Sequence, residues 1–307
     1  MLAYERLGSG SPLVLIHGLT DSRRVWDPLL GPLAANFDVV SVDLRGHGES
    51  FTAPPYDGVT LASDVHDVVE SLGVDNPLVV GHSLGGFVAT AYASRFDCAG
   101  VLNIDQSLDL SAFQALVNPF RTELADPAQF EPIMLMVFAT MRGALSDEEW
   151  DRLARERRLN QSVVLGIWGS FLDLDAAGMD DFIDSFTRPI TAPYLALHGS
   201  ALAPDYESWL ATRVATAHLV EWPELGHLPH LVEPDRFVSL VERFAAAVAT
   251  PDGWRDAELE ANSERSASDS AMIEPTWSVS IKKPSCPAGE VITFTRPARG
   301  IRRASSS

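Results

Sequence analysis

The sequence predicts an α/β fold with a mainly parallel central sheet, and three observations support this prediction. Short continuous apolar runs, such as residues 12–16 and 77–80, recur along the chain and are typical of strands covered on both faces. Segments with helical spacing of apolar residues separate these runs. At residues 77–86, an apolar run ends in Gly-x-Ser-x-Gly and continues as a helical pattern. Strands that alternate with helices form parallel sheets with right-handed crossovers.

The remaining elements of this core follow in chain order. Strands are expected at residues 2–7, 12–16, 38–42, 77–81, 100–104, 194–197 and 217–221. Helices are expected at residues 22–35, 60–72, 84–96, 206–213 and 234–249. We expect Thr60 to cap the second of these helices with its side-chain oxygen.

The pattern changes between residues 106 and 190, where strand signals are absent. Helices are expected at 111–124, 127–143, 147–160, 161–174 and 179–187, with interruptions at Pro119 and Pro132. We therefore expect a core formed by residues 1–105 and 191–250, with residues 106–190 as an all-helical cap inserted between two strands. Ligands of such sheets bind at the carboxyl ends of the strands, where this insertion begins.

Residues 251–307 have a different composition from the rest of the chain. Serine-rich stretches at 263–270 and 305–307, together with scattered prolines, predict a low-complexity and mostly disordered C-terminal tail. A hairpin formed by residues 277–281 and 290–295 is the alternative, because both segments have β character.

Charge and composition limit the classes of partner. The net charge is −19, and residues 1–250 carry all of it, with 15 basic and 34 acidic side chains. Such a body repels phosphate backbones, so we expect no nucleic-acid partner. No run of about 18 apolar residues predicts a membrane span, and the first residues do not resemble a signal peptide. Cys98 and Cys286 suggest neither a metal site nor a disulfide. We expect a cytoplasmic monomer or homodimer that acts on a small molecule.

The chemistry centres on Ser83 in the Gly-x-Ser-x-Gly motif. Gly81 and Gly85 allow a strand and a helix to approach closely at a sharp turn, which lifts a strained serine clear of the sheet. We interpret Ser83 as a nucleophile, and the alternative is a serine that caps the following helix.

Four motifs in order resemble the α/β-hydrolase superfamily. They are His17-Gly18, Asp43-x-x-Gly46-x-Gly48-x-Ser50, Gly81-x-Ser83-x-Gly85 and Gly226-His227. The resemblance covers about residues 1–250, with the helical insertion in the usual cap position. It implies an α/β-hydrolase fold and a catalytic triad in the order nucleophile, acid, histidine. Epoxide hydrolases and dehalogenases of this superfamily usually carry an aspartate where Ser83 stands, so the resemblance disfavours their chemistry.

The resemblance also assigns the base and the oxyanion hole. His227 matches the histidine loop of the superfamily, whereas His198, His218 and His230 are the other downstream histidines. The backbone N–H groups of Leu19 and Leu84 are expected to form the oxyanion hole. His17 is expected to shape its loop through hydrogen bonds.

The sequence departs from the usual pattern of the superfamily at the acidic residue of the catalytic triad. Most relatives place an aspartate at the position that Leu202 occupies here. Asp105, at the end of a strand, is our first candidate, because a rigid mount favours preorganised catalysis. Asp205 is the second candidate, and a site without an acid is the third.

The cap supplies apolar side chains for a substrate pocket, although packing within the cap is the alternative role for each of them. Met134, Phe138, Trp168 and Phe171 are the candidates for substrate binding. We expect no metal and no cofactor, and a serine hydrolase that cleaves an uncharged, fairly hydrophobic ester or lactone through an acyl-enzyme. Two other functions stay open: C–C bond hydrolysis or cofactor-free lyase or cyclase chemistry, and ligand sensing with very slow turnover.

Overall fold

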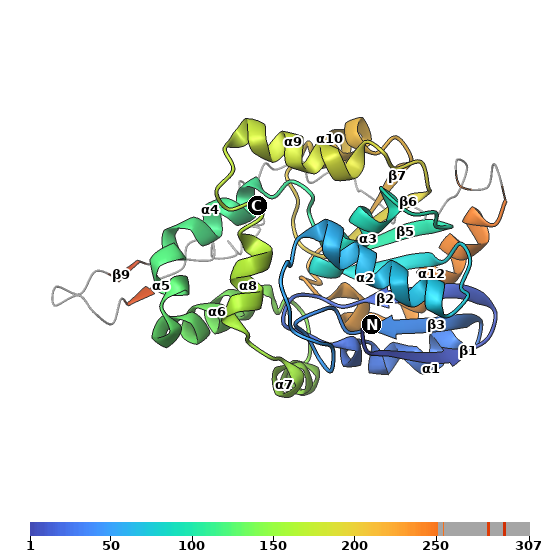
Figure 1. The fold of residues 1–307 in the computed structure, drawn as a ribbon, viewed down its shortest axis with the longest axis horizontal. Coiled ribbons are helices and arrows are strands. Elements are labelled where there is room, and N and C mark those ends of the chain that lie inside the picture. The colour runs from blue at the N-terminus through green and yellow to red at the C-terminus, as the bar shows by residue number, and fades with distance from the viewer. Residues whose placement is uncertain (251–253, 255–280, 283–290, 293–307) are drawn as a thin grey trace, which may run out of the picture. The chain divides into compact units, whose positions relative to one another are not determined.

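The computed structural model of the chain describes residues 1–250, Trp254, residues 281–282 and residues 291–292 (Figure 1). Met1–Glu260 form one compact unit, referred to below as the body, and Ala261–Ser307 form a second unit. In the second unit, β8 (Ile281–Lys282) pairs antiparallel with β9 (Val291–Ile292). The rest of the predicted tail, apart from Trp254, lies outside the described residues.

The body contains a seven-stranded sheet in the order β1-β3-β2-β4-β5-β6-β7. The strands are β1 (Tyr4–Gly8), β2 (Ser11–Ile16), β3 (Phe37–Val42), β4 (Leu78–His82), β5 (Gly100–Ile104), β6 (Tyr194–His198) and β7 (Ala217–Glu221). All neighbouring strands are parallel except β1, which pairs antiparallel with β3 at the edge. The mainly parallel sheet predicted from the apolar runs is therefore confirmed.

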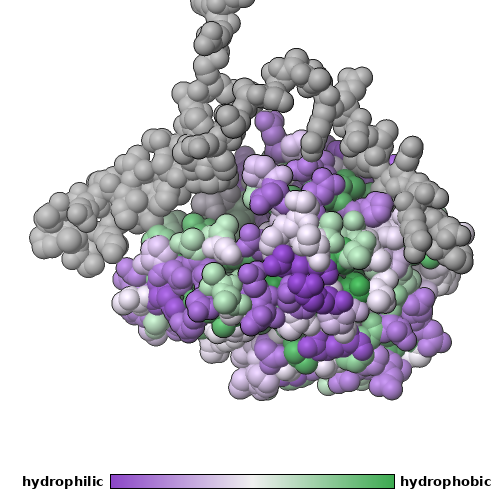
Figure 2. All heavy atoms as spheres, turned by 90° about the horizontal axis from the view of Figure 1, so that it is seen from above, coloured by the Kyte–Doolittle hydropathy of each residue, from purple (hydrophilic) through white to green (hydrophobic). Residues whose placement is uncertain are grey.

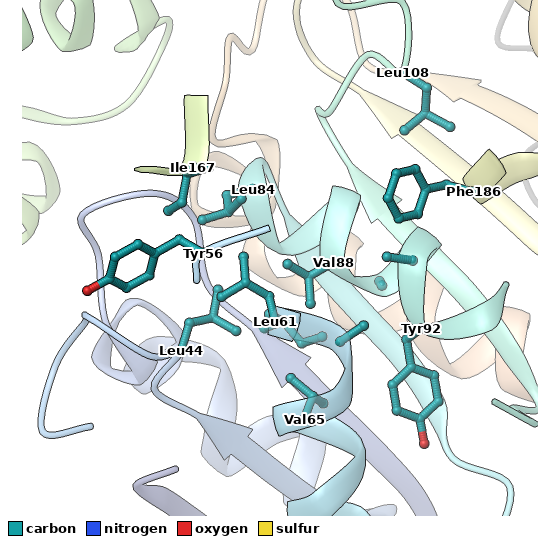
Figure 3. Close-up of a cluster of buried hydrophobic side chains, with 14 of the residues drawn as sticks. Leu44, Tyr56, Leu61, Val65, Leu84, Val88, Tyr92, Leu108, Ile167 and Phe186 are labelled. Carbon is teal, nitrogen blue, oxygen red and sulfur yellow. The ribbon is translucent and has the colours of Figure 1, made fainter. Parts of the chain in front are cut away.

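Side chains of the central strands alternate between two apolar cores, one on each face of the sheet. In β2, for example, Val14 and Ile16 join one core, whereas Leu13 and Leu15 join the other. This alternation buries both faces, as the continuous apolar runs require. Figure 3 shows the first core between the helices that follow β3 and β4, with Leu61 and Val65 lying beside Val88.

The helices outside the cap segment agree closely with the sequence pattern. They are α1 (Asp27–Ala34), preceded by a 3-10 turn at Arg23–Trp26, α2 (Gly58–Ser71), α3 (Leu84–Ala93), α10 (Tyr206–Arg213), α11 (Pro229–Val232) and α12 (Pro234–Val248). One expected cap is wrong. The N-cap of α2 is Asp57, whose carboxylate accepts the Thr60 N–H at 2.9 Å, because the helix begins two residues earlier than predicted.

Between β5 and β6 the chain forms helices and no described strand. These helices are α4 (Ser111–Val117), α5 (Arg121–Ala125), α6 (Pro127–Met141), α7 (Asp147–Glu156), α8 (Gln161–Trp168) and α9 (Ala176–Thr187). The single helix predicted over 111–124 is wrong, because a 3-10 turn at Asn118–Phe120, which contains Pro119, separates α4 from α5. Figure 1 shows α4 to α8 gathered on one side of the sheet.

Trp254 extends the body beyond the boundary predicted at residue 250. Its ring is buried against Phe244, at 4.9 Å between ring centroids, and its Nε1–H donates to the Thr216 carbonyl at 2.8 Å. No helix among the described residues is long and apolar enough to cross a membrane. On the face in Figure 2, hydrophilic side chains surround small apolar patches wherever coloured atoms are visible.

The turn from β4 to α3 leaves no room for side chains at two glycines. A Cβ atom added to Gly81 would overlap the carbonyl of Gly85. A Cβ atom added to Gly85 would overlap the carbonyl of Ile16 and lie 2.7 Å from that of His17. The strand and the helix can pack this closely only because both positions lack a side chain, as the sequence predicted.

We predict that Gly85→Ala lowers the free energy of unfolding by about 1–3 kcal/mol, since backbone atoms must shift to admit the methyl group. Gly31→Ala is the matched control, because a Cβ atom at Gly31 in α1 meets nothing within 4 Å. The control should raise stability by about 0.5–1 kcal/mol, since alanine favours a helix. Urea unfolding of both variants measures the difference. Equal effects would show that the turn tolerates a side chain.

Candidate active site

Ser83 lies at the sharp turn between β4 and α3 in a strained backbone conformation. Its φ is +53° and its ψ is −122°, a region that non-glycine residues rarely adopt. The Ser83 N–H donates to the carbonyl of Ile104 at 2.9 Å, which fixes the turn against the end of β5. Its side chain makes no capping bond to α3, so the alternative role as a helix cap is not observed. The residue has the geometry that a nucleophile elbow requires.

Asp105 and His227 contact each other although 122 positions separate them in the sequence. The Nδ1 atom of His227 lies 2.7 Å from Oδ2 of Asp105, at hydrogen-bond distance. Asp105 follows β5 directly, and His227 lies on the loop between β7 and α11. With Nδ1–H donated to the carboxylate, Nε2 of a neutral His227 ring is available as a proton acceptor.

The loop after β6 holds the carboxylate of Asp105 with three further hydrogen bonds. The backbone N–H groups of Gly199 and Ser200 donate to Oδ1 at 2.8 and 2.9 Å, and the Ser200 hydroxyl donates to Oδ2 at 2.7 Å. Burial would raise the pKa of the Asp105 carboxyl, but the hydrogen bond and charge of His227 outweigh it. The pKa therefore lies below its ordinary value.

The second candidate for the acid lies elsewhere. Asp205 is exposed at the start of α10 and makes no capping bond to that helix. Leu202 packs against the apolar core. Of the two aspartates considered from the sequence, Asp105 is therefore the one whose carboxylate contacts His227.

Three buried histidine rings surround this pair. His82 lies 4.7 Å from the rings of both His227 and His230, and its Nε2–H donates to the His227 carbonyl at 2.8 Å. His198 lies behind Asp105, with 3.7 Å between Nδ1 and Oδ1. Burial lowers the pKa of His198 to about 4 and that of His230 to about 3, and it also lowers that of His82. These rings are thus neutral near pH 7.

The loop after β2 reaches the elbow through Gly18. A Cβ atom added to Gly18 would lie 3.3 Å from Cβ of Ser83, so the loop that carries Leu19 passes beside the serine. His17 stabilises this loop, because its ring bonds the Gly18 carbonyl at 2.7 Å and accepts the Leu44 N–H at 3.0 Å. Leu84 is the first residue of α3, where backbone N–H groups have no partner within the helix.

The turn at residues 43–50 is a structural support at the end of β3. The Asp43 carboxylate accepts the N–H groups of Arg23 and Glu49 at 2.7 and 2.9 Å, and it also pairs with the Arg23 side chain. Ser50 donates to the Asp43 carbonyl at 2.6 Å.

The cap segment is bonded directly to the histidine loop. The His227 N–H donates to the carbonyl of Met141 at 3.2 Å, and the Ala144 N–H donates to that of Leu225 at 3.1 Å. Gly143 and Gly226 approach so closely that a Cβ atom on either would clash with the other. The end of α6 therefore helps to fix His227.

The four side chains predicted to bind substrate are buried. Met134 and Phe138 of α6, Trp168 of α8 and the following Phe171 belong to the apolar core that also contains Leu84. Figure 3 shows Ile167, the neighbour of Trp168, beside Leu84. The cap thus packs over the residue after Ser83, and direct contact of the four side chains with a substrate stays a prediction.

Several residues of this site were not singled out from the sequence. Gly199 and Ser200 donate hydrogen bonds to the carboxylate of Asp105. Their sequence shows no pattern that predicts this role, although they lie in the loop where most relatives carry the triad aspartate. Asp21 and Arg157 form a buried ion pair near the elbow, at 3.6 Å. No cluster of three or more His, Cys, Asp or Glu side chains among the described residues is arranged to hold a metal ion.

Comparison with protein families and curated proteins gives consistent matches. The model of a family described as "Alpha/beta hydrolase family" matches residues 13–240. The AB hydrolase superfamily protein YisY of Bacillus subtilis is 25% identical over 258 residues, which cover 80% of this chain and 95% of that protein. A soluble epoxide hydrolase of a Corynebacterium species is 43% identical over 91 residues, or 29% of this chain and 32% of that enzyme. The chain also matches uncharacterized mycobacterial proteins over only 28% of their length, at 37% identity.

Solved structures agree on the fold. The enol-lactonase of Burkholderia xenovorans superimposes with a TM-score of 0.59 at 23% identity, over 80% of this chain and 96% of that enzyme. Together with the family match, this likeness confirms the fold predicted from the four motifs.

We predict that Asp105→Asn destabilises the fold in a pH-dependent manner. Because the folded pKa of Asp105 lies below its value of about 3.9 in an unfolded chain, its carboxylate stabilises the fold above about pH 4. This stabilisation is lost as pH falls further, through the folded pKa. The variant should therefore lose about 1–3 kcal/mol at pH 6, and the difference from the parent should shrink at pH 3.

Urea unfolding at the two pH values measures this difference, with the exposed Asp205→Asn as the control of equal charge change. A difference that stayed the same at both pH values would contradict an ionised, hydrogen-bonded Asp105.

Proposed function

The chain belongs to the alpha/beta hydrolase family, and from that premise we propose that it is a serine hydrolase. Its proposed substrate is a carboxylic ester or lactone of a fairly hydrophobic small molecule. The observation that carries the proposal is the 2.7 Å contact of His227 with Asp105, in a chain whose Ser83 has the strained backbone of a nucleophile elbow. A serine alone is a weak nucleophile and needs an oriented base to take its proton.

In the proposed reaction, the Ser83 hydroxyl attacks the carbonyl carbon while Nε2 of His227 accepts its proton. Asp105 holds the imidazole in the tautomer with Nδ1–H and stabilises the imidazolium that forms. The histidine then donates the proton to the leaving alcohol. Water, activated by the same ring, hydrolyses the acyl-enzyme and releases the acid.

The developing oxyanion requires two N–H donors, which we assign to Leu19 and Leu84. Leu84 is suited to this role because it begins α3, so its N–H points out of the helix start. Leu19 follows Gly18, which lies against Ser83. Each such donor contributes about 10²–10³-fold to the rate in related acyl-transfer chemistry.

Support for ester or lactone cleavage over epoxide opening comes from the nucleophile. One epoxide hydrolase matches the sequence of this chain over 32% of its own length, and a solved epoxide hydrolase shares the fold over 94% of its length, so the fold alone does not separate the two reactions. Epoxide hydrolases usually carry an aspartate at the elbow, and Ser83 stands there in this chain. A serine forms an ester intermediate with an acyl group, which fits hydrolysis of an ester or lactone.

We predict that Ser83→Ala reduces the hydrolysis of p-nitrophenyl butyrate by at least about 10³-fold in kcat, because no nucleophile remains. Asp105→Asn should reduce kcat by about 10²–10⁴-fold, since the imidazole loses its orienting partner. Asp205→Asn is the matched control and should stay within about twofold of the parent.

Rapid mixing of the enzyme with a saturating excess of the ester distinguishes the serine hydrolase from the other two functions. A burst of p-nitrophenol equal to the enzyme concentration is expected for an acyl-enzyme. Full activity of Ser83→Ala would refute the serine mechanism. Turnover of 1,3-diketones without ester cleavage would favour C–C bond hydrolysis, and a single slow turnover would favour a ligand sensor.

A further inference from the structure

The side chain of Arg157 is buried, and one of its polar atoms has no partner within hydrogen-bond distance. Only 8% of its surface is exposed, and its Nε atom has no hydrogen-bond partner. The nearest carboxylate oxygen, Oδ1 of Asp21, lies 3.6 Å from Nε, which is an ion pair but too long for a hydrogen bond. The guanidinium lies over the ring of Phe138 at 4.0 Å and near that of Trp150 at 5.4 Å.

Such a guanidinium is incompletely paired. A buried charge is costly unless it is both paired and hydrogen-bonded, and arginine usually binds carboxylates through two parallel N–H groups. Other half-buried arginines of this body meet that requirement. Arg45 donates to Asp64 and to two backbone carbonyls, and Arg152 donates to Glu149 and to the Arg24 carbonyl. Arg157 is thus poised to accept an anionic ligand.

Arg157 lies close to the candidate active site. The next residue, Arg158, donates its backbone N–H to the Thr20 carbonyl at 2.9 Å, on the loop that carries Leu19. A Cβ atom added to Gly18 would lie 3.4 Å from Oδ2 of Asp21 and 3.3 Å from Cβ of Ser83. Asp21 of the ion pair and Ser83 of the elbow therefore both lie next to Gly18.

The local charge also favours an anion. Residues 152–158 contain four of the 15 basic residues of the first 250, with a single glutamate among them. In a body that is otherwise strongly acidic, this concentrates positive potential at one end of α7.

We propose that Arg157 binds a carboxylate of the substrate, and that the substrate is an ester or lactone whose acyl part is an apolar chain ending in that carboxylate. The inference rests on the proposed function and replaces the expectation of an uncharged substrate. The chain would lie along the apolar side chains of α6, such as Phe138, while the ester carbonyl reaches Ser83. When no substrate is bound, Asp21 forms an ion pair with the guanidinium, and it competes with the substrate carboxylate for Arg157.

Two esters that differ only in charge test the proposal. Monomethyl glutarate carries a terminal carboxylate, and methyl 5-amino-5-oxopentanoate carries a neutral amide of the same shape. We expect the parent to hydrolyse the anionic ester with at least a tenfold higher kcat/KM in a pH-stat assay at pH 7.5. Arg157→Gln should abolish this preference, whereas Asp21→Asn should increase it, because the competing carboxylate is gone.

Matched controls isolate the local effect. Arg155→Gln removes the same charge from an exposed position of α7 and should keep the preference of the parent. Arg157→Lys keeps the charge but not the bidentate geometry, and it should retain part of the preference. Thermal unfolding identifies any variant that fails to fold. If Arg157→Gln does not fold, the partial loss of preference in Arg157→Lys tests the proposal instead.

The outcomes separate this inference from the proposed function. Equal rates for the two esters in the parent, or a preference that survives in Arg157→Gln, would overturn the role of Arg157. Loss of all hydrolysis in Ser83→Ala would still support the serine mechanism in that case. If the parent cleaves neither glutarate ester, inhibition of p-nitrophenyl butyrate hydrolysis by free glutarate is measured instead. Competitive inhibition would support carboxylate binding by Arg157, and its absence would overturn the inference.

Discussion

The carboxylate of Asp105 joins three segments that are far apart in the sequence. It follows β5, accepts hydrogen bonds from Gly199 and Ser200 after β6, and contacts His227 on the loop after β7. Each of these segments begins at the carboxyl end of a parallel strand, so the sheet itself brings them together. Because the carboxylate is buried, its loss would leave these donors unsatisfied, and the geometry of the candidate site depends on it.

The cap takes part in the same arrangement. Its residues 141–144 bond the histidine loop, and the N–H of Arg158 bonds the loop that carries Leu19. His227, the proposed base, and the loop of the predicted oxyanion donor are therefore both held from the core and from the cap. The apolar side chains of the cap pack into the core that also contains Leu84, so a shift of the cap would move these groups relative to Ser83.

Much of this arrangement could be predicted from the sequence, and the limits have physical reasons. Gly81 and Gly85 identified the elbow, because a turn this tight excludes side chains. The sequence favoured Asp105 over Asp205 because a strand end is a rigid mount, but it left Asp205 open, since that choice depends on the path of the loop at 199–205. That loop does not supply the carboxylate that contacts His227, and it donates hydrogen bonds to Asp105 instead. Arg157 was missed because an arginine at a helix end has the pattern of a solvated charge, and only tertiary packing buries it.

The central claim is that Ser83 is activated by a histidine that Asp105 orients. Its most direct test is the rate at which a p-nitrophenyl phosphonate modifies the protein, with the modified residue located by peptide mass spectrometry. The account predicts one adduct on Ser83, formed at least about 10²-fold more slowly in Asp105→Asn and at the parent rate in Asp205→Asn. An adduct on another residue, or equal rates in both variants, would contradict it.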